Sequence, residues 1–142
     1  MVQYLYKLSR KQFKVIFFIT VAVILYKALT PSVGEPLFHF KNMDKVLHAS
    51  AFFVLSFLLN RSSSSIHTRI RNILALLGFG VFIEIAQSFT GYRDASVADV
   101  FADLTGILLF QFSYSYLKSK QHKKRKIKNK KISITPLSQK FG

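Results

Sequence analysis

The sequence of 142 residues contains no cysteine, no tryptophan, three prolines and only six acidic residues. The absence of cysteine excludes disulfides, thiol catalysis and metal sites built on thiolates. The six acidic residues stand against 21 lysines and arginines, which gives a formal net charge of +15. Half of the residues are nevertheless hydrophobic, and 15 of them are phenylalanine. The positions of the basic and hydrophobic residues along the chain, and not their totals, therefore indicate the class of protein.

The hydrophobic residues are concentrated in four runs, separated by joints that contain charged residues, prolines or glycines. The runs are Phe13–Leu29, Val46–Leu59, Ile73–Phe89 and Val97–Leu117. Such segregation is typical of transmembrane helices and not of a soluble core. We therefore predict an all-α polytopic membrane protein. Residues 1–117 form one domain, a bundle of four transmembrane helices, and residues 118–142 form a basic tail.

The first run also fits a cleaved signal peptide, because basic residues precede it. No clear small-x-small cleavage site follows it, however. Lys14 and Lys27 lie near its two ends, where their side chains can extend to the membrane interfaces. We therefore interpret this run as the first transmembrane helix.

Basic residues alternate between the joints in a way that predicts the orientation. Residues 1–14 contain four, Arg61, Arg69 and Arg71 separate the second run from the third, and the tail follows the fourth. The positive-inside rule then places both termini in the cytoplasm. With this topology all six acidic residues lie in outer loops or in the outer halves of helices. An outward-facing polar cluster is the simplest explanation.

The tail has nine lysines or arginines among residues 118–131. Like charges at this density repel one another, so we predict that the tail is disordered or lies on a surface. A cytoplasmic segment of this kind attracts anionic lipid, which we expect as its partner. No aromatic stacking pattern accompanies the charge, so nucleic acid is not an expected partner.

Polar residues gather at the outer ends of the last three runs and in the turn between the third and the fourth. Spacings of three and four positions place the members from one run on one helix face. A charge near the membrane centre costs roughly 2.5–3.5 kcal/mol, so several of them close together indicate a function. The predicted site consists of Lys45, His48, Glu84, Gln87, Arg93, Asp99 and Asp103.

Two kinds of chemistry fit these residues. His48 can act as a general base oriented by a carboxylate, and Glu84 and Asp99 are the other candidate catalytic residues. No Ser-His-Asp or Cys-His signature identifies a nucleophile. The candidate ligand-binding residues are Lys45, Gln87, Arg93 and Asp103, of which the two cations suit a phosphate or a carboxylate.

Two alternatives stay open. Histidine and carboxylates can ligate a divalent ion, but the site has one histidine, so we predict no metal and no cofactor. The charged groups can also simply pair with one another and lock the helices together. In that case Arg93 would pair with Asp99, and Glu84 with Lys45 or His48, although buried ion pairs often add little stability.

The order of these residues resembles a known family. The pattern is Asp44-Lys45-x-x-His48 with Phe52, then Glu84-x-x-Gln87, then Arg93-x-x-Ser96-x-x-Asp99 ending in Gly106. Over residues 41–110 it resembles the VanZ-like family. The family pattern usually has asparagine where this chain has Asp103, so the role of that position does not transfer simply.

The resemblance implies a small protein of the bacterial inner membrane, and the family's namesake is associated with low-level teicoplanin resistance. We therefore expect a polar intramembrane site that binds a cell-envelope component, either lipid-linked or related to peptidoglycan. The alternative is a membrane enzyme that acts on an anionic lipid-linked headgroup through its histidine and carboxylates.

Overall fold

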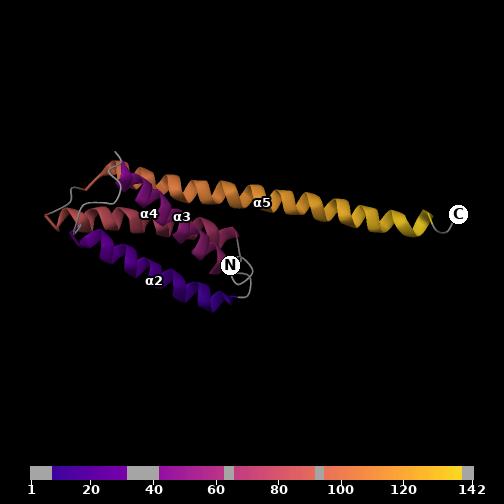
Figure 1. Cartoon of the computed structure of the whole chain (residues 1–142), viewed down its shortest axis with the longest axis horizontal. Coiled ribbons are helices and arrows are strands. Elements are labelled where there is room, and N and C mark those ends of the chain that lie inside the picture. The colour runs from indigo at the N-terminus through magenta and orange to yellow at the C-terminus, as the bar shows by residue number, and fades with distance from the viewer. Residues whose placement is uncertain (1–7, 32–41, 63–65, 92–94, 139–142) are drawn as a thin grey trace. The chain divides into compact units, whose positions relative to one another are not determined.

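The computed structural model describes residues 8–31, 42–62, 66–91 and 95–138, except the side chains of residues 66–67 and 131–138. It contains four α-helices, α2 (Arg10–Leu29), α3 (Met43–Ser62), α4 (Ile66–Ser88) and α5 (Val97–Ser138) (Figure 1). Each of the four is long and apolar enough to cross a membrane. The prediction of an all-helical protein with four helices of transmembrane length is thus confirmed, and the orientation of the termini stays a prediction.

Helices α2, α3 and α4 begin earlier than the corresponding hydrophobic runs, whereas α5 begins at Val97 as the run does. Helix α2 begins at Arg10 because Ser9 caps it. The Ser9 hydroxyl accepts a hydrogen bond from the backbone N–H of Gln12, and the side-chain oxygen of Gln12 accepts one from the backbone N–H of Ser9. This reciprocal capping satisfies two donors that a helix start leaves unpaired. Helix α4 begins seven residues before the predicted Ile73, because basic residues fit a helix surface as well as apolar ones do.

One compact unit extends to Phe110 and contains α2, α3, α4 and the beginning of α5. Its buried core combines residues from the last three of these helices, namely Phe52, Leu55, Leu76, Ile83 and Ile107. Helix α3 contributes five buried residues, whereas α2 contributes Phe13 alone. Large apolar side chains such as Phe18, Phe82 and Phe101 are exposed instead, as expected for surfaces that face lipid tails.

Two glycines allow close approach between helices in this unit. A Cβ atom at Gly106 of α5 would collide with the backbone of Ala49 on α3. A Cβ atom at Gly80 of α4 would lie 2.5 Å from the Asp103 carboxylate and 3.3 Å from Phe52. Small residues at such positions let transmembrane helices pack backbone to backbone. They bring α3, α4 and α5 together beneath the polar residues.

The tail differs from the prediction of disorder, because α5 continues as a helix to Ser138. Lysine, arginine and glutamine are good helix formers. The side chains of residues 118–130 are all exposed, so water weakens the repulsion between their charges. Residues 111–142 form a second compact unit. The predicted boundary between residues 117 and 118 lies within α5 and stays a prediction.

Candidate functional site

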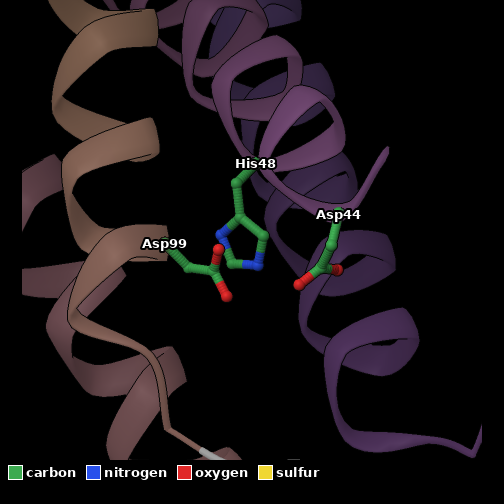
Figure 2. Close-up of side chains that lie close together, drawn as sticks. All are labelled: Asp44, His48 and Asp99. Carbon is green, nitrogen blue, oxygen red and sulfur yellow. The ribbon is translucent and has the colours of Figure 1, made fainter. Parts of the chain in front are cut away.

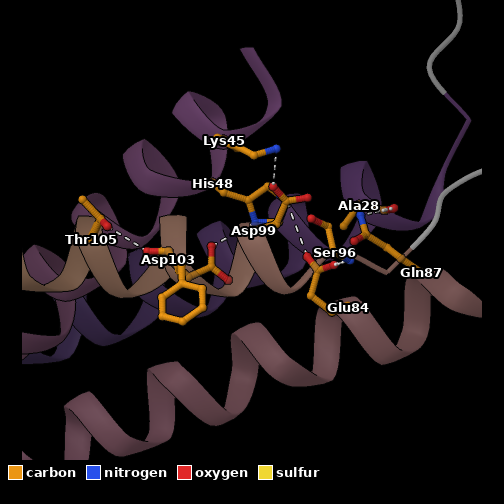
Figure 3. Close-up of polar contacts among 10 residues, drawn as sticks. Ala28, Lys45, His48, Glu84, Gln87, Ser96, Asp99, Asp103 and Thr105 are labelled. Atoms are coloured by element: carbon orange, nitrogen blue, oxygen red, sulfur yellow. Dashed lines mark hydrogen bonds and ion pairs between the residues drawn. The ribbon is translucent and has the colours of Figure 1, made fainter. Parts of the chain in front are cut away.

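His48 occupies the centre of the polar cluster, between carboxylates from two other helices (Figure 3). It lies on α3, and its Nδ1 atom is 2.9 Å from Oδ1 of Asp103 on α5. Its Nε2 atom is 3.8 Å from Oε1 of Glu84 on α4. Three consecutive helices thus meet at one imidazole ring, which is largely buried.

Asp103 is fully buried, at 0% exposure. One carboxylate oxygen contacts His48, while Oδ2 lies against Gly80 and has no hydrogen-bond partner among the described residues. The glycine makes room for the carboxylate, because any larger side chain would occupy its position. This chain therefore fixes the histidine ring with a charged group from the fourth helix.

Asp99 lies one helical turn before Asp103 and pairs with a cation. Its Oδ1 atom is 3.5 Å from Nζ of Lys45. The Asp99 side chain is 7% exposed and that of Lys45 is 42% exposed, so the ion pair extends from the interior to the surface. The distance between Nζ and Oδ1 is that of an ion pair, and Oδ1 makes no hydrogen bond within the described residues. The ammonium group of Lys45 therefore offsets the charge of this carboxylate.

Glu84 connects α4 with the start of α5. Its Oε2 atom accepts a hydrogen bond of 2.7 Å from the backbone N–H of Ser96, which directly precedes α5. A carboxylate at this place also interacts favourably with the positive end of the helix dipole. The second oxygen, Oε1, is buried and has no hydrogen-bond partner among the described residues.

Gln87 makes a contact outside the cluster. Its Nε2 atom donates a hydrogen bond of 3.1 Å to the carbonyl of Ala28, one of the last carbonyls of α2, which lack partners within their own helix. The amide thus ties α4 to the end of α2, and binding of a ligand by Gln87 stays a prediction. Arg93, the other predicted ligand-binding residue, lies outside the described residues together with Asp94.

A cavity of about 360 Å³ lies beside His48, between α2, α3 and α4. Its apolar lining consists of Val23, Ile24, Ala28, Leu47, Ala51, Phe52 and Ile83, and its polar lining of Lys27, Asp44 and His48. Most of the wall therefore suits a hydrocarbon chain, and the three polar residues suit a charged group.

The predicted site does not include Lys27 or Asp44. The sequence indicates an interfacial position for Lys27, and Asp44 only as part of the family pattern. A signal for Asp44 was present, because it precedes His48 by four positions and therefore shares its helix face. Asp44, His48 and Asp99 each offer one nitrogen or oxygen, and these atoms lie within 4.8 Å of one another (Figure 2). No comparable local signal existed for Lys27.

Of the contacts expected under the structural alternative, the structure contains the one between His48 and Glu84, at 3.8 Å, which is an ion pair only when the imidazole is protonated. Asp99 pairs with Lys45, and the expected pair with Arg93 lies outside the described residues. The chemistry available at the site is therefore that of an oriented imidazole, several buried carboxylates and a partly exposed ammonium group.

The comparisons with known proteins gave one match. The model of a family described as VanZ/LLP1 matches residues 2–127, which include every residue of the candidate site. No curated protein and no solved structure matches the chain.

Proposed function

The chain belongs to the VanZ/LLP1 family, and from this premise we propose that it is a membrane protein whose polar cluster binds the anionic headgroup of an envelope amphiphile. The proposed location is the bacterial inner membrane, with both termini in the cytoplasm and the cluster facing outward. The ligand class is a lipid-linked or peptidoglycan-related component, through which the protein would influence susceptibility to glycopeptides such as teicoplanin.

The cavity beside His48 is the observation that carries this proposal. It has an extended apolar wall, while Lys27, Asp44 and His48 line its polar part. An amphiphile has the same division, with a hydrocarbon chain and a charged or polar headgroup. Pockets that bind small molecules combine an apolar lining with a few polar groups that fix the orientation of the ligand.

The headgroup is proposed to be anionic because one lysine lines the cavity and a second, outside its lining, lies three positions before His48 on α3. Lys27 lines the cavity, and Lys45 is partly exposed beside Asp99. Arg93, the second cation of the predicted site, suits a phosphate or carboxylate because its guanidinium can donate two parallel hydrogen bonds. A charge-assisted contact of this kind contributes about 1.5–3 kcal/mol.

Neutralising Lys45 separates ligand binding from mere ion pairing. We expect Lys45→Gln to lower the affinity for the amphiphile about ten- to hundredfold while the protein stays folded. Lipids that copurify with the full-length protein would be identified by native mass spectrometry and lipidomics, and their retention compared between the wild type and the variant.

The double variant Lys45→Gln with Asp99→Asn provides the control for this experiment. It removes both charges of the 3.5 Å pair and so leaves no buried carboxylate unpaired by the loss of the lysine. Under the proposal the double variant stays folded and still fails to retain the lipid. Recovery of both stability and lipid retention in the double variant would show that Lys45 only neutralises Asp99.

The contact between His48 and Asp103 favours a second candidate, a membrane enzyme that acts on the same headgroup. A carboxylate that holds Nδ1 leaves Nε2 as a proton acceptor, which is the arrangement of a general base. His48→Gln distinguishes the two functions. An enzyme would lose turnover and keep its substrate bound, whereas a binding protein would have no turnover to lose.

The basic segment of α5 is proposed to contact anionic lipid. Residues 118–130 are exposed in the structure, and each basic residue near an anionic membrane surface contributes about 1 kcal/mol of attraction. Such an attraction weakens as the salt concentration rises.

A further inference from the structure

Asp44, His48 and Asp99 offer the donor atoms of a metal site. One nitrogen or oxygen from each lies within 4.8 Å of the other two, and Figure 2 shows the imidazole between the two carboxylates. Ligands of one ion with bonds of about 2.1 Å lie at most about 4.2 Å apart. A shift of at most about 0.6 Å in any pair therefore brings the three atoms within the separations that ligands of one ion adopt.

His48 is oriented as metal-binding histidines are. Its Nδ1 atom is 2.9 Å from the fully buried carboxylate of Asp103. Histidines that bind metals commonly donate their other ring N–H to a carboxylate, which fixes the tautomer and the direction of the ring. The contact with Asp103 leaves Nε2 as the nitrogen that can bind an ion.

A buried oxygen of Glu84 also lies close to this nitrogen. Its Oε1 atom is 3.8 Å from Nε2 of His48, a separation that two ligands of the same ion adopt. The Glu84 side chain is 6% exposed, and Oε1 has no hydrogen-bond partner among the described residues. Burial of an unpaired carboxylate oxygen is costly, and a cation between Glu84 and His48 would compensate it.

The charges of these residues also favour a bound cation. As whole residues, Glu84, Asp99 and Asp103 are each no more than 5% exposed, and Lys45 places one positive charge 3.5 Å from Asp99. With His48 neutral, as a metal ligand must be, three ionised carboxylates and one ammonium would leave two negative charges. A divalent cation would neutralise these, so that Lys45 could still attract an anionic headgroup.

From this geometry we infer that the protein binds one divalent cation of the first transition series, through His48 Nε2 and carboxylate oxygens of Asp44 and Asp99, with the buried Oε1 of Glu84 beside the same histidine nitrogen. Asp103 positions the histidine from the side away from the ion. The donor set, one imidazole with carboxylates, suits manganese, iron or zinc, since magnesium and calcium prefer oxygen ligands alone. The inference goes beyond the proposed function, because it concerns an inorganic ligand and stands without the amphiphile.

Binding of manganese to the full-length protein in detergent tests this inference. Mn²⁺ would be titrated into metal-free protein, and free Mn²⁺ measured by electron paramagnetic resonance. We expect saturable binding of one ion per chain. Zn²⁺ should displace Mn²⁺ at lower concentration than Mg²⁺ does, because imidazole favours zinc.

Three variants and one control locate the ion. Asp99→Asn and His48→Gln should each weaken Mn²⁺ binding at least tenfold, because each removes a ligand. Lys45→Gln should instead strengthen it several-fold, because the ammonium at 3.5 Å competes with the metal for Asp99. Ser56→Ala serves as the control, since Ser56 is buried two turns further along the same face of α3 and should leave Mn²⁺ binding unchanged. Circular dichroism would establish that every variant keeps its helical content.

Several results would overturn the inference. The absence of saturable Mn²⁺ binding at millimolar concentration would do so, as would equal affinities in the wild type and in folded His48→Gln and Asp99→Asn proteins. Equal displacement of Mn²⁺ by Mg²⁺ and Zn²⁺ would exclude His48 as a ligand. The proposed amphiphile is tested separately, because Lys45→Gln is expected to lose that ligand while it gains affinity for the metal.

Discussion

At the scale of single residues, the interior of this protein has to accommodate polar groups that apolar surroundings disfavour. The buried carboxylate of Asp103 is accommodated in this way: one oxygen contacts Nδ1 of His48, and the other lies against Gly80. A buried hydrogen bond of this kind adds little net stability, but loss of one partner leaves the other unsatisfied. Substitutions at residue 103 can therefore separate the hydrogen bond from the charge.

We expect Asp103→Ala to lower the free energy of unfolding by about 1–3 kcal/mol, because Nδ1 of His48 would lose its partner. Asp103→Asn keeps an acceptor oxygen and removes a buried charge, so its stability should equal or exceed that of the wild type. Unfolding by denaturing detergent, followed by circular dichroism, would compare the three proteins. Equal losses in both variants would mean that the charge, and not the hydrogen bond, stabilises this position.

At the scale of the helices, the polar cluster exists because α3, α4 and α5 approach one another closely. The glycines set this distance: Gly106 faces the backbone of Ala49, and Gly80 faces Asp103 and Phe52. A backbone cannot move aside as the end of a flexible side chain can. The contact at Gly106 is therefore the less tolerant of the two.

Gly106→Ala should destabilise the protein by about 1–3 kcal/mol, because the added methyl group would collide with the backbone of Ala49. Gly78→Ala provides a matched control in another transmembrane helix, since a Cβ atom there would have no neighbour within 4 Å. Its stability should stay the same or rise slightly, as alanine is the better helix former. The same unfolding experiment would measure the stability of both variants. A Gly106→Ala protein as stable as Gly78→Ala would contradict the close packing of α3 and α5.

At the scale of the whole molecule, four helices of transmembrane length and the basic segments between them define a topology. The proposed orientation places both termini inside and the cluster outside. The orientation matters for function, because an outward-facing site meets lipid-linked precursors after their export.

The natural absence of cysteine makes this topology directly testable. Single cysteines would be introduced as Ser65→Cys, Ala95→Cys and Arg125→Cys, and labelled in intact cells with a thiol reagent that does not cross the membrane. We expect labelling at residue 95, and labelling at residues 65 and 125 only after the membrane is made permeable. Labelling of residue 65 or 125 in intact cells would reverse the orientation.

The sequence alone determined the four helices of transmembrane length that the described residues contain and the helix faces that predicted site residues share. Hydrophobic runs and helical spacing are local properties, so the four helices and the shared face of Lys45 and His48 could be predicted without a fold. Local rules predict a disordered or surface-bound tail, and the helix that continues to Ser138 differs from the first of these states, since lysine and arginine are good helix formers. Contact of the tail with a surface stays a prediction.

Only the tertiary structure decided which polar residues meet. Pairing of His48 with Asp103 and of Lys45 with Asp99 depends on the depth and rotation of one helix against another, which spacing within a single helix does not encode. For the same reason the contact of Gln87 with Ala28 and the positions of Lys27 and Asp44 in the cavity wall became visible only in the fold. Helical periodicity selects a face, and packing between helices selects the partner of that face.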